Sequence, residues 1–203
     1  MDQQQTLIAE NQRLREEVVA LRAEVRFLRQ NRAIAKGIQG EALVSHLLGG
    51  KASSVGASHD FTAASGALIE IKYSSLLACV KSRPTRRWVW SKMFGERGQK
   101  RYDRLLLIGD VDPRHRELYA APHSPYVIFD LPFEAATEIC GGIKIGPESK
   151  LQVTTNPSTV RSWQAQALFN HFQVSPRELK VRYPKLSPVE KSRDRSHQEW
   201  SGR

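Results

Sequence analysis

The chain has 203 residues, of which 40% are hydrophobic, and this suits one globular core with an appendage better than two large domains. No stretch approaches the roughly 18 apolar residues of a membrane helix, and the polar start has no apolar segment like that of a signal peptide. We therefore expect an intracellular (cytoplasmic) protein with no membrane partner. The formal net charge of +10 indicates a polyanionic partner, and the two distant cysteines, Cys79 and Cys140, indicate buried thiols instead of a zinc site or a disulfide framework.

Residues 1–33 have the heptad pattern of a parallel, dimeric coiled coil. The residues at positions a and d are Leu7, Asn11, Leu14, Val18, Leu21, Val25 and Leu28. Valine at a with leucine at d favours two strands, and one asparagine at a favours the same state. The g positions hold glutamates and the e positions hold arginines, which pair across a parallel dimer. A single amphipathic helix packed on the domain is the alternative, but it needs a broader apolar face and no such separation of charge.

The segment that follows, residues 34–150, is predicted to fold as an α/β domain. A helix is expected over 34–48, because its apolar residues recur at helical spacing and Gly49-Gly50 supplies a stop. Short strands are expected at 52–55, 58–61 and 68–73. In the last of these, strand alternation places Glu70 and Lys72 on the same face.

Two carboxylates and a lysine are predicted to meet at this strand. If 58–61 pairs with 68–73 as a hairpin, Asp60 lies beside Glu70 and Lys72. Carboxylates offer the hard oxygen ligands that suit Mg²⁺ or Mn²⁺, and the backbone carbonyl of Ile71 can join them. Such a metal polarises a phosphodiester and activates water, while Lys72 orients that water or stabilises charge on phosphate. The pattern predicts phosphodiester hydrolysis; a solvated strand face with a surface ion pair is the alternative.

These residues resemble the PD-(D/E)xK nuclease superfamily, which has the restriction-endonuclease-like fold. The matching pattern is Asp60, nine intervening residues, and then Glu70-Ile71-Lys72, after a helix that contains Gly40-Glu41; His59 stands in place of the proline. The resemblance covers about 34–110. It implies a central mixed sheet flanked by helices, in the order helix, three strands, helix, strand, with 105–109 as the later strand. It also implies that Asp60 and Glu70 bind the metal, that Lys72 is the catalytic lysine, and that Glu41 adds to the metal site.

A block of basic and aromatic residues follows the predicted active-site strand. Between Lys81 and Arg104 the chain holds nine basic and two acidic residues, a net +7. Cations and flat rings together suit phosphate contact and base stacking. The residues predicted to contact DNA are Arg86, Arg87, Trp88, Trp90, Lys92, Lys100 and Arg101. For the two tryptophans, burial as core or dimer-interface anchors is the alternative.

The rest of the domain and the C-terminal part are predicted from local patterns. The apolar run 105–109 indicates an interior strand, 117–121 and 126–129 indicate further strands, and 132–140 indicates a helix. Residues 151–184 are expected to form a helical extension, with helices starting at Asn156-Pro157 and Ser175-Pro176. The two helices either cap the core or form a helix-turn-helix that reads DNA. The basic tail, 185–203, is predicted to be disordered.

The sequence as a whole favours a Mg²⁺-dependent DNA endonuclease that works as a homodimer, of the kind used in restriction or defence. Two active sites on one particle allow both strands of a duplex to be cut. A branched-DNA or recombination-associated nuclease is an alternative, since some superfamily members attach coiled coils to this domain. A protein that keeps the fold but binds DNA without cutting it, as a scaffold, is another.

Overall fold

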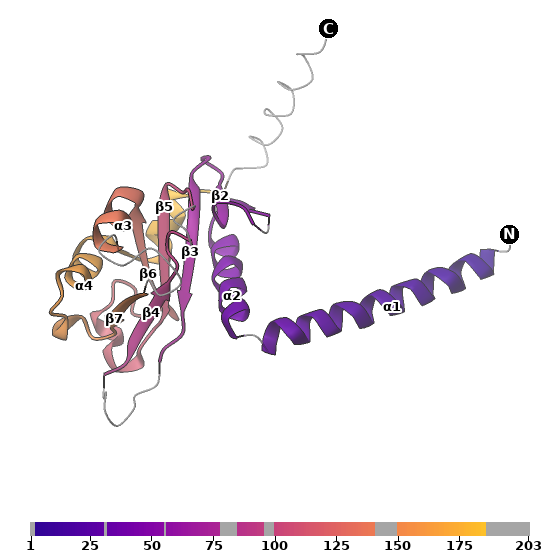
Figure 1. Ribbon diagram of the computed structural model, residues 1–203, viewed down its shortest axis with the longest axis horizontal. Helices are drawn as coiled ribbons and strands as arrows, with labels where there is room; N and C mark the ends of the chain where they lie inside the picture. Colours follow the sequence, from indigo (N-terminus) through magenta and orange to yellow (C-terminus); the bar gives the residue numbers. More distant parts are fainter. Residues whose placement is uncertain are drawn as a thin grey trace, which may run out of the picture. The chain divides into compact units, whose positions relative to one another are not determined.

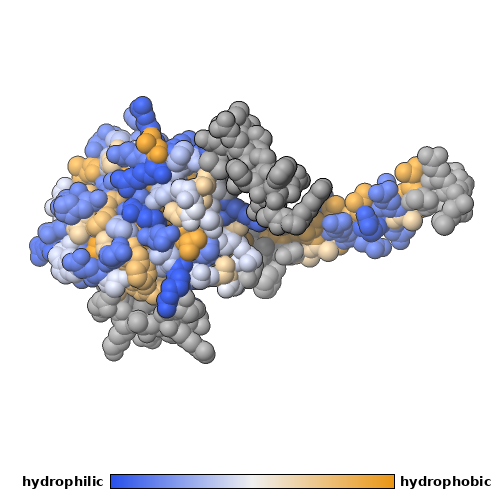
Figure 2. Space-filling view, turned by 90° about the horizontal axis from the view of Figure 1, so that it is seen from above, coloured by the Kyte–Doolittle hydropathy of each residue, from blue (hydrophilic) through white to orange (hydrophobic). Residues whose placement is uncertain are grey.

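A computed structural model describes residues 3–30, 32–54, 56–77, 85–95, 100–140 and 150–185, in two compact units, 1–38 and 39–203. The first unit contains α1 (Gln3–Gln30) and the beginning of α2 (Arg32–Leu47). Hydrophobic and hydrophilic residues lie side by side along α1 (Figure 2). The predicted N-terminal helix is therefore confirmed, and its pairing with a second chain stays a prediction. No helix in the ranges described here is long and apolar enough to cross a membrane.

The second unit is built on a six-stranded mixed sheet in the order β1-β2-β3-β5-β6-β8 (Figure 1). Its strands are β1 (Gly50–Ala52), β2 (Phe61–Ala63), β3 (Leu68–Ser74), β5 (Arg104–Asp110), β6 (Tyr126–Pro132) and β8 (Gln173–Val174). Only β3 and β5 are parallel neighbours in this sheet as described. A separate antiparallel pair consists of β4 (Arg87–Ser91) and β7 (Lys150–Thr154). The expected α/β class with a mixed central sheet is confirmed.

The central strand β5 carries a hydrophobic core on each of its faces. Leu105 and Leu107 point into one core, Leu106 and Ile108 into the other, and all four side chains are fully buried. The first core is covered by β4, β7, α3 (Phe133–Cys140) and α4 (Trp163–Ala167). The second is covered by the C-terminal half of α2 and by α5 (Pro176–Arg182). Burial on both faces explains the unbroken apolar run, and the predicted interior strand is confirmed.

The connection between the parallel strands β3 and β5 contains β4, whose tryptophans belong to the core. Trp88 and Trp90 are 0% and 1% exposed. Their indole nitrogens donate to the carbonyls of Asp110 and Ile108 at 2.8 and 2.9 Å, so burial leaves neither N–H without an acceptor. The prediction that these two rings stack on DNA bases is wrong, and the core-anchor alternative is correct. A strand thus occupies the described part of a connection where the resemblance implies a helix.

Several element boundaries differ from the sequence-based expectations. The strand predicted at 117–121 is absent, and a 3-10 helix, η1 (Pro113–Leu118), covers its first two residues. Asp112 starts that helix by accepting a hydrogen bond from the Arg114 backbone, and proline follows it at the first helical position. The first two strands lie two or three residues away from their predicted positions. β7 and β8 were not predicted, because both are short and lack a long alternating pattern.

The C-terminal segments close the second core and part of the first. The elements are η2 (Pro157–Thr159), α4, a π-helical turn η3 (Leu168–Phe172) and α5. Ser175 and Glu178 form the expected capping box at the start of α5. Leu168 and Leu179 are fully buried, so these helical segments pack on the sheet. This agrees with the alternative in which they cap the core. Cys140 is buried as predicted, whereas Cys79 and residues 186–203 lie outside the described residues.

One buried carboxylate ties α5 to the middle of the sheet. Asp130 on β6 is 1% exposed. Its oxygens lie 2.9 Å from the guanidinium groups of Arg104 on β5 and Arg182 on α5, and Tyr183 lies 3.4 Å away. A buried anion needs such compensation, because removing it from water is costly. The end of α5 is therefore held by charge as well as by apolar packing.

Gly109→Ala is expected to lower the free energy of unfolding. A Cβ at Gly109 would lie 2.5 to 2.6 Å from three atoms of the Trp88 indole, a rigid and fully buried ring. Overpacking of this kind costs about 1 to 3 kcal/mol. Gly37→Ala is the matched control, because a Cβ there meets nothing within 4 Å and alanine favours a helix by up to about 1 kcal/mol. Urea unfolding of both variants checks this; equal effects would contradict the packing described here.

Candidate active site

Asp60 is held against β3 by the predicted hairpin. β2 and β3 pair antiparallel, with Phe61 opposite Ile69, and the Asp60 backbone donates to the Ile69 carbonyl at 3.0 Å. The carboxylate of Asp60 continues this pairing, because its Oδ2 accepts a hydrogen bond from the Ile71 backbone at 2.9 Å. The hairpin on which the site prediction depended is confirmed. One oxygen of Asp60 is thereby fixed, and the other, Oδ1, faces away from the strand backbone.

Glu70 and Lys72 share the face of β3 that the alternation predicts. The Glu70 side chain has no solvent exposure, and its Oε1 lies 2.5 Å from Lys72 Nζ. The Lys72 side chain keeps 21% exposure, so it is partly accessible to solvent, whereas the Glu70 side chain is fully buried. The alternative of a solvated strand face is therefore excluded for Glu70. Its pairing with Lys72 is a partly buried ion pair, not a surface one.

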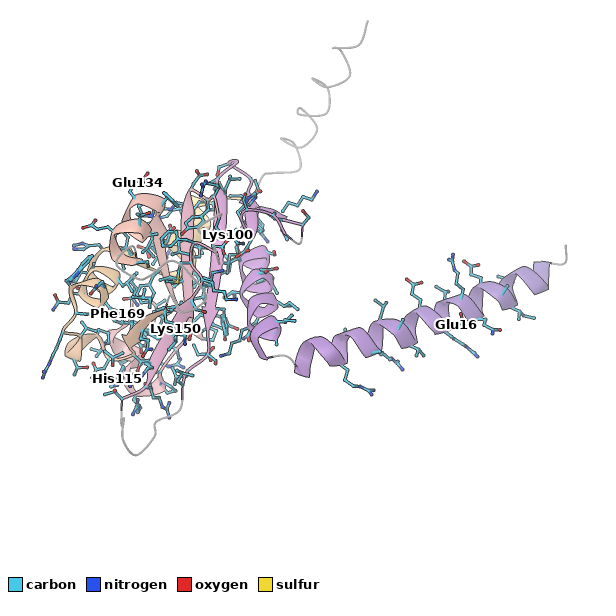
Figure 3. The ribbon with its side chains drawn as sticks, viewed as in Figure 1. Glu16, Lys100, His115, Glu134, Lys150 and Phe169 are labelled. Atoms are coloured by element: carbon cyan, nitrogen blue, oxygen red, sulfur yellow. The ribbon has the colours of Figure 1, made fainter. Side chains whose placement is uncertain are left out.

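Lys100 is the residue of this site that sequence reasoning placed elsewhere. Its Nζ lies 3.1 Å from Asp60 Oδ1 and 3.0 Å from Glu70 Oε2, so one ammonium bridges the two carboxylates. Lys100 is labelled in Figure 3. We had predicted a DNA contact from its place in the basic block. The location of Lys100 in this site follows from the parallel pairing of β3 with β5, which brings the residues before Arg104 to the beginning of β3.

Glu41 reaches the same site from α2. It lines a pocket of about 570 Å³ together with Asp60, Lys100, His59 and five small residues, Ser53, Ser54, Gly56, Ala57 and Ser58. Burial raises the pKa of the Glu41 carboxyl, and the nearby charge of Asp60 raises it further, while Lys100 and Lys72 act in the opposite direction. Glu41 is therefore electrostatically coupled to the site. No hydrogen bond between it and the other carboxylates is described.

His59 has a structural role beside this pocket. Its Nε2 lies 2.9 Å from the Thr62 hydroxyl, and its Nδ1 lies 3.3 Å from the Ser58 hydroxyl. Both ring nitrogens therefore have polar neighbours. This agrees with a hydrogen-bonded histidine, and it explains how a residue other than proline can precede Asp60 here.

The buried charges shift one another's pKa values. Burial raises the pKa of Glu70, Asp60 raises it as well, and Lys72 and Lys100 partly offset both effects. For Lys100, burial alone would lower the pKa, but the charges of Glu70 and Asp60 outweigh burial and raise it. Lys100 therefore holds its proton firmly. The site contains two ammonium groups beside two converging carboxylates.

The donor set fits a divalent cation of the Mg²⁺ type. The Lys100 ammonium occupies the position that a metal cation would take, because it lies where oxygens of Asp60 and Glu70 converge. The N–H and C=O of a strand residue point to the same edge, so the Ile71 carbonyl faces the side on which Asp60 lies. All these donors are hard oxygens. Within the described ranges no three His, Cys, Asp or Glu side chains gather as a metal cluster, so the carbonyl and solvent water would complete the coordination.

The predicted DNA-contacting cations have separate environments. Arg86 lies 3.5 Å from the buried carboxylate of Asp112, and Arg87 donates to Gln152 on β7 at 3.1 Å. Lys92 has a positive φ of 56° and follows β4 directly. Arg101 donates a side-chain hydrogen bond to the Lys100 carbonyl. Arg86 and Arg87 keep partial exposure at β4, while Lys100 is engaged in the carboxylate site.

In comparisons with known proteins, no family model and no curated sequence matches the chain. The chemistry of the site therefore has to be argued from its own residues.

Glu70→Gln is expected to reduce the pH dependence of folding. A carboxyl whose pKa is raised on folding stabilises the fold below its unfolded value of 4.5, and this contribution is lost as pH rises through the folded pKa. The parent should therefore lose more stability than Glu70→Gln between about pH 5 and pH 8. Urea unfolding at both pH values measures the difference. Glu117→Gln, an exposed change on η1, is the control, and parallel pH profiles for parent and Glu70→Gln would refute the expectation.

Proposed function

We propose that this chain is a Mg²⁺- or Mn²⁺-dependent DNA endonuclease. The observation that carries the proposal is the convergence of Asp60 and Glu70 on one cation position, with Lys72 beside it and partly open to solvent. Two carboxylates and a strand carbonyl can hold a metal that polarises a phosphodiester and activates water, and a lysine beside them can stabilise the charge that develops. The resemblance to the PD-(D/E)xK superfamily supports the same assignment, although strand β4 lies in a connection where the resemblance implies a helix.

The residues divide the work by their accessibility. Asp60, Glu70 and the Ile71 carbonyl would hold the cation, which, when bound, supplies Lewis-acid polarisation of the phosphodiester and a lower pKa for water. Asp60 is oriented for this role by its hydrogen bond from the Ile71 backbone. The side chain of Lys72, which is paired with Glu70, remains partly accessible to solvent. It can orient the attacking water or stabilise negative charge on the phosphate.

The pocket beside Asp60 suits a nucleic-acid backbone. Ser53, Ser54 and Ser58 are among the residues that line it, and phosphate oxygens commonly accept hydrogen bonds from serine side chains and backbone N–H groups. Glu41 at the pocket wall would orient water or a cation-bound ligand. The net charge of +10 attracts a polyanion without sequence preference. Arg86, Arg87, Lys92 and Arg101 remain the proposed DNA contacts outside the pocket.

The exposed seam of α1 supports a homodimer. Leu7, Leu14 and Leu21 are 61%, 48% and 52% exposed, and Val18 and Val25 are each 44% exposed. Apolar side chains at heptad spacing favour burial against a second helix of the same kind. Glutamates at g and arginines at e suit a parallel partner. A parallel pair would place two nuclease domains after the same end of the coil and so allow two cuts in one duplex.

Removing either the carboxylate or the lysine is expected to abolish cleavage. Glu70→Gln and Lys72→Met should each lower the rate of plasmid cleavage in Mg²⁺ by about 10²-fold or more, because the first weakens the cation site and the second removes the ammonium that acts on water or phosphate. EDTA should stop cleavage by the parent. Glu138→Gln on α3 and Lys150→Met on β7 make the same changes at exposed positions and should cleave normally.

Equal cleavage by parent and site variants would refute the nuclease assignment. Salt-sensitive DNA binding without turnover in any divalent metal would instead indicate the non-catalytic scaffold. Running the same assay on duplex, single-stranded and junction DNA separates a restriction-type enzyme from a branched-DNA nuclease.

Charges in the α1 seam are expected to separate the dimer. Leu14→Asp combined with Leu21→Asp places four carboxylates in the seam of a paired coil, so sedimentation should give a monomer where the parent gives a dimer. Val19→Asp is the matched control, because Val19 is an exposed apolar residue outside the a and d positions. A chain that begins at Ala33 tests the coil as a whole. A dimer that survives both changes would show that another surface makes it.

A further inference from the structure

The side chain of Lys100 occupies the point on which the two site carboxylates converge. Its ammonium contacts Asp60 Oδ1 at 3.1 Å and Glu70 Oε2 at 3.0 Å, and the side chain is only 19% exposed. The remaining oxygens are already engaged, Asp60 Oδ2 by the Ile71 backbone and Glu70 Oε1 by Lys72. A divalent cation and the Lys100 ammonium would therefore use the same two oxygens. They cannot do so together, because cations this close repel each other strongly.

The backbone around Lys100 is held in place by hydrogen bonds. Replacement of its ammonium by a divalent cation would therefore need only its side chain to move. The Lys100 backbone N–H donates to the Phe94 carbonyl at 3.2 Å, and the Arg101 backbone N–H donates to the Ser58 carbonyl at 3.0 Å. Asp60 is fixed by its own hydrogen bond to β3. A lysine has a flexible four-carbon stem, and Lys100 itself lines the pocket together with Ser53, Ser54 and Ser58. The ammonium can leave the carboxylates without any change in the strands.

Charge balance gives this exchange a direction. Asp60 and Glu70 carry two negative charges, and Lys72 and Lys100 carry two positive ones, so these four groups are neutral together. A divalent cation between the carboxylates leaves both ammonium groups without these partners, and the nearby Glu41 carboxyl offsets at most one of their two charges, so positive charge is in excess. That excess is matched best by a phosphate group in the adjoining pocket. Binding of cation and of phosphate should therefore support each other.

We infer that Lys100 is a tethered counter-ion that competes with the divalent cation for Asp60 and Glu70 and, once displaced, contacts the phosphate of the substrate. The inference rests on the proposed function and adds to it a coupling between metal loading and DNA binding. Without DNA, the ammonium keeps the affinity for metal low. With DNA, the phosphate attracts the ammonium and opens the cation position, which is positive cooperativity between the two ligands.

The test measures Mn²⁺ binding to the DNA-free protein, from the electron paramagnetic resonance signal of free Mn²⁺. Lys100→Met removes the competing charge, and we expect its Kd for Mn²⁺ to fall by about tenfold or more relative to the parent. Lys150→Met on β7 removes the same charge in the second sheet and should leave the Kd unchanged (Figure 3). Adding a short, uncleavable phosphorothioate duplex should tighten Mn²⁺ binding by the parent, and this effect should be much smaller in Lys100→Met.

A second measurement uses the unaltered protein, in case Lys100→Met does not fold. Mass spectrometry of the chain after brief acetylation reports how reactive each lysine is. Mg²⁺ should increase the acetylation of Lys100, since the displaced ammonium enters the solvent-accessible pocket, and should leave that of Lys150 unchanged.

The outcomes separate the inference from the proposed function. A parent that binds Mn²⁺ and cleaves DNA, with unchanged or weaker Mn²⁺ binding in Lys100→Met, overturns the role of Lys100 and leaves the nuclease intact. Unchanged acetylation of Lys100 in Mg²⁺ overturns it in the same way. A parent that neither binds Mn²⁺ nor cleaves DNA overturns both.

Discussion

The charge of Glu70, a carboxylate without solvent in the middle of a sheet, is the constraint on which the arrangement of the site depends. An anion in this position is tolerated only with cations in direct contact. Lys72 supplies one from the same strand, and Lys100 supplies the other from the far end of the crossover. Compensation of the Glu70 charge therefore requires that the β2–β3 hairpin, the β3–β5 parallel pair and the loop before β5 all form. A leucine at this position would need no such compensation.

The parallel pairing of β3 with β5 in turn depends on β4. A crossover between parallel strands has to cover one face of the sheet, and helices usually do so. Here, within the residues described, a strand with two tryptophans covers it, and both indoles donate to carbonyls at the end of β5. Gly109 lets the Trp88 ring lie directly against the strand backbone. The basic residues around these rings remain at the surface, so one segment provides both core anchors and cations.

The structural features that could be predicted from sequence are those determined by interactions between residues close together in the chain. Alternation placed Glu70 and Lys72 on one face, ten residues with a turn placed Asp60 beside them, and the serine and glutamate before α5 gave its cap. Features decided by distant partners were not predictable in this way. Lys100 looks like any other lysine in a basic block until β3 and β5 are paired. From sequence, Trp88 could be buried or could stack on a nucleic-acid base. Which of these occurs depends on whether β4 packs on the central sheet, and the sequence of β4 alone does not specify that. The predicted strand at 117–121 failed because local capping by Asp112 outweighs a weak strand preference.

The hold of Asp130 on Arg182 has a consequence for the order in which the chain can fold during synthesis. β6 precedes β8 and α5 in the chain, so Arg182 can pair with Asp130, and α5 can complete the cover that α2 begins over Leu106 and Ile128, only after these later elements have been made. A growing chain that has not yet released residues near 183 from the ribosome therefore lacks one of the two guanidinium partners of Asp130 and part of the cover over this core. Strand β8 and helix α5 complete the described sheet last.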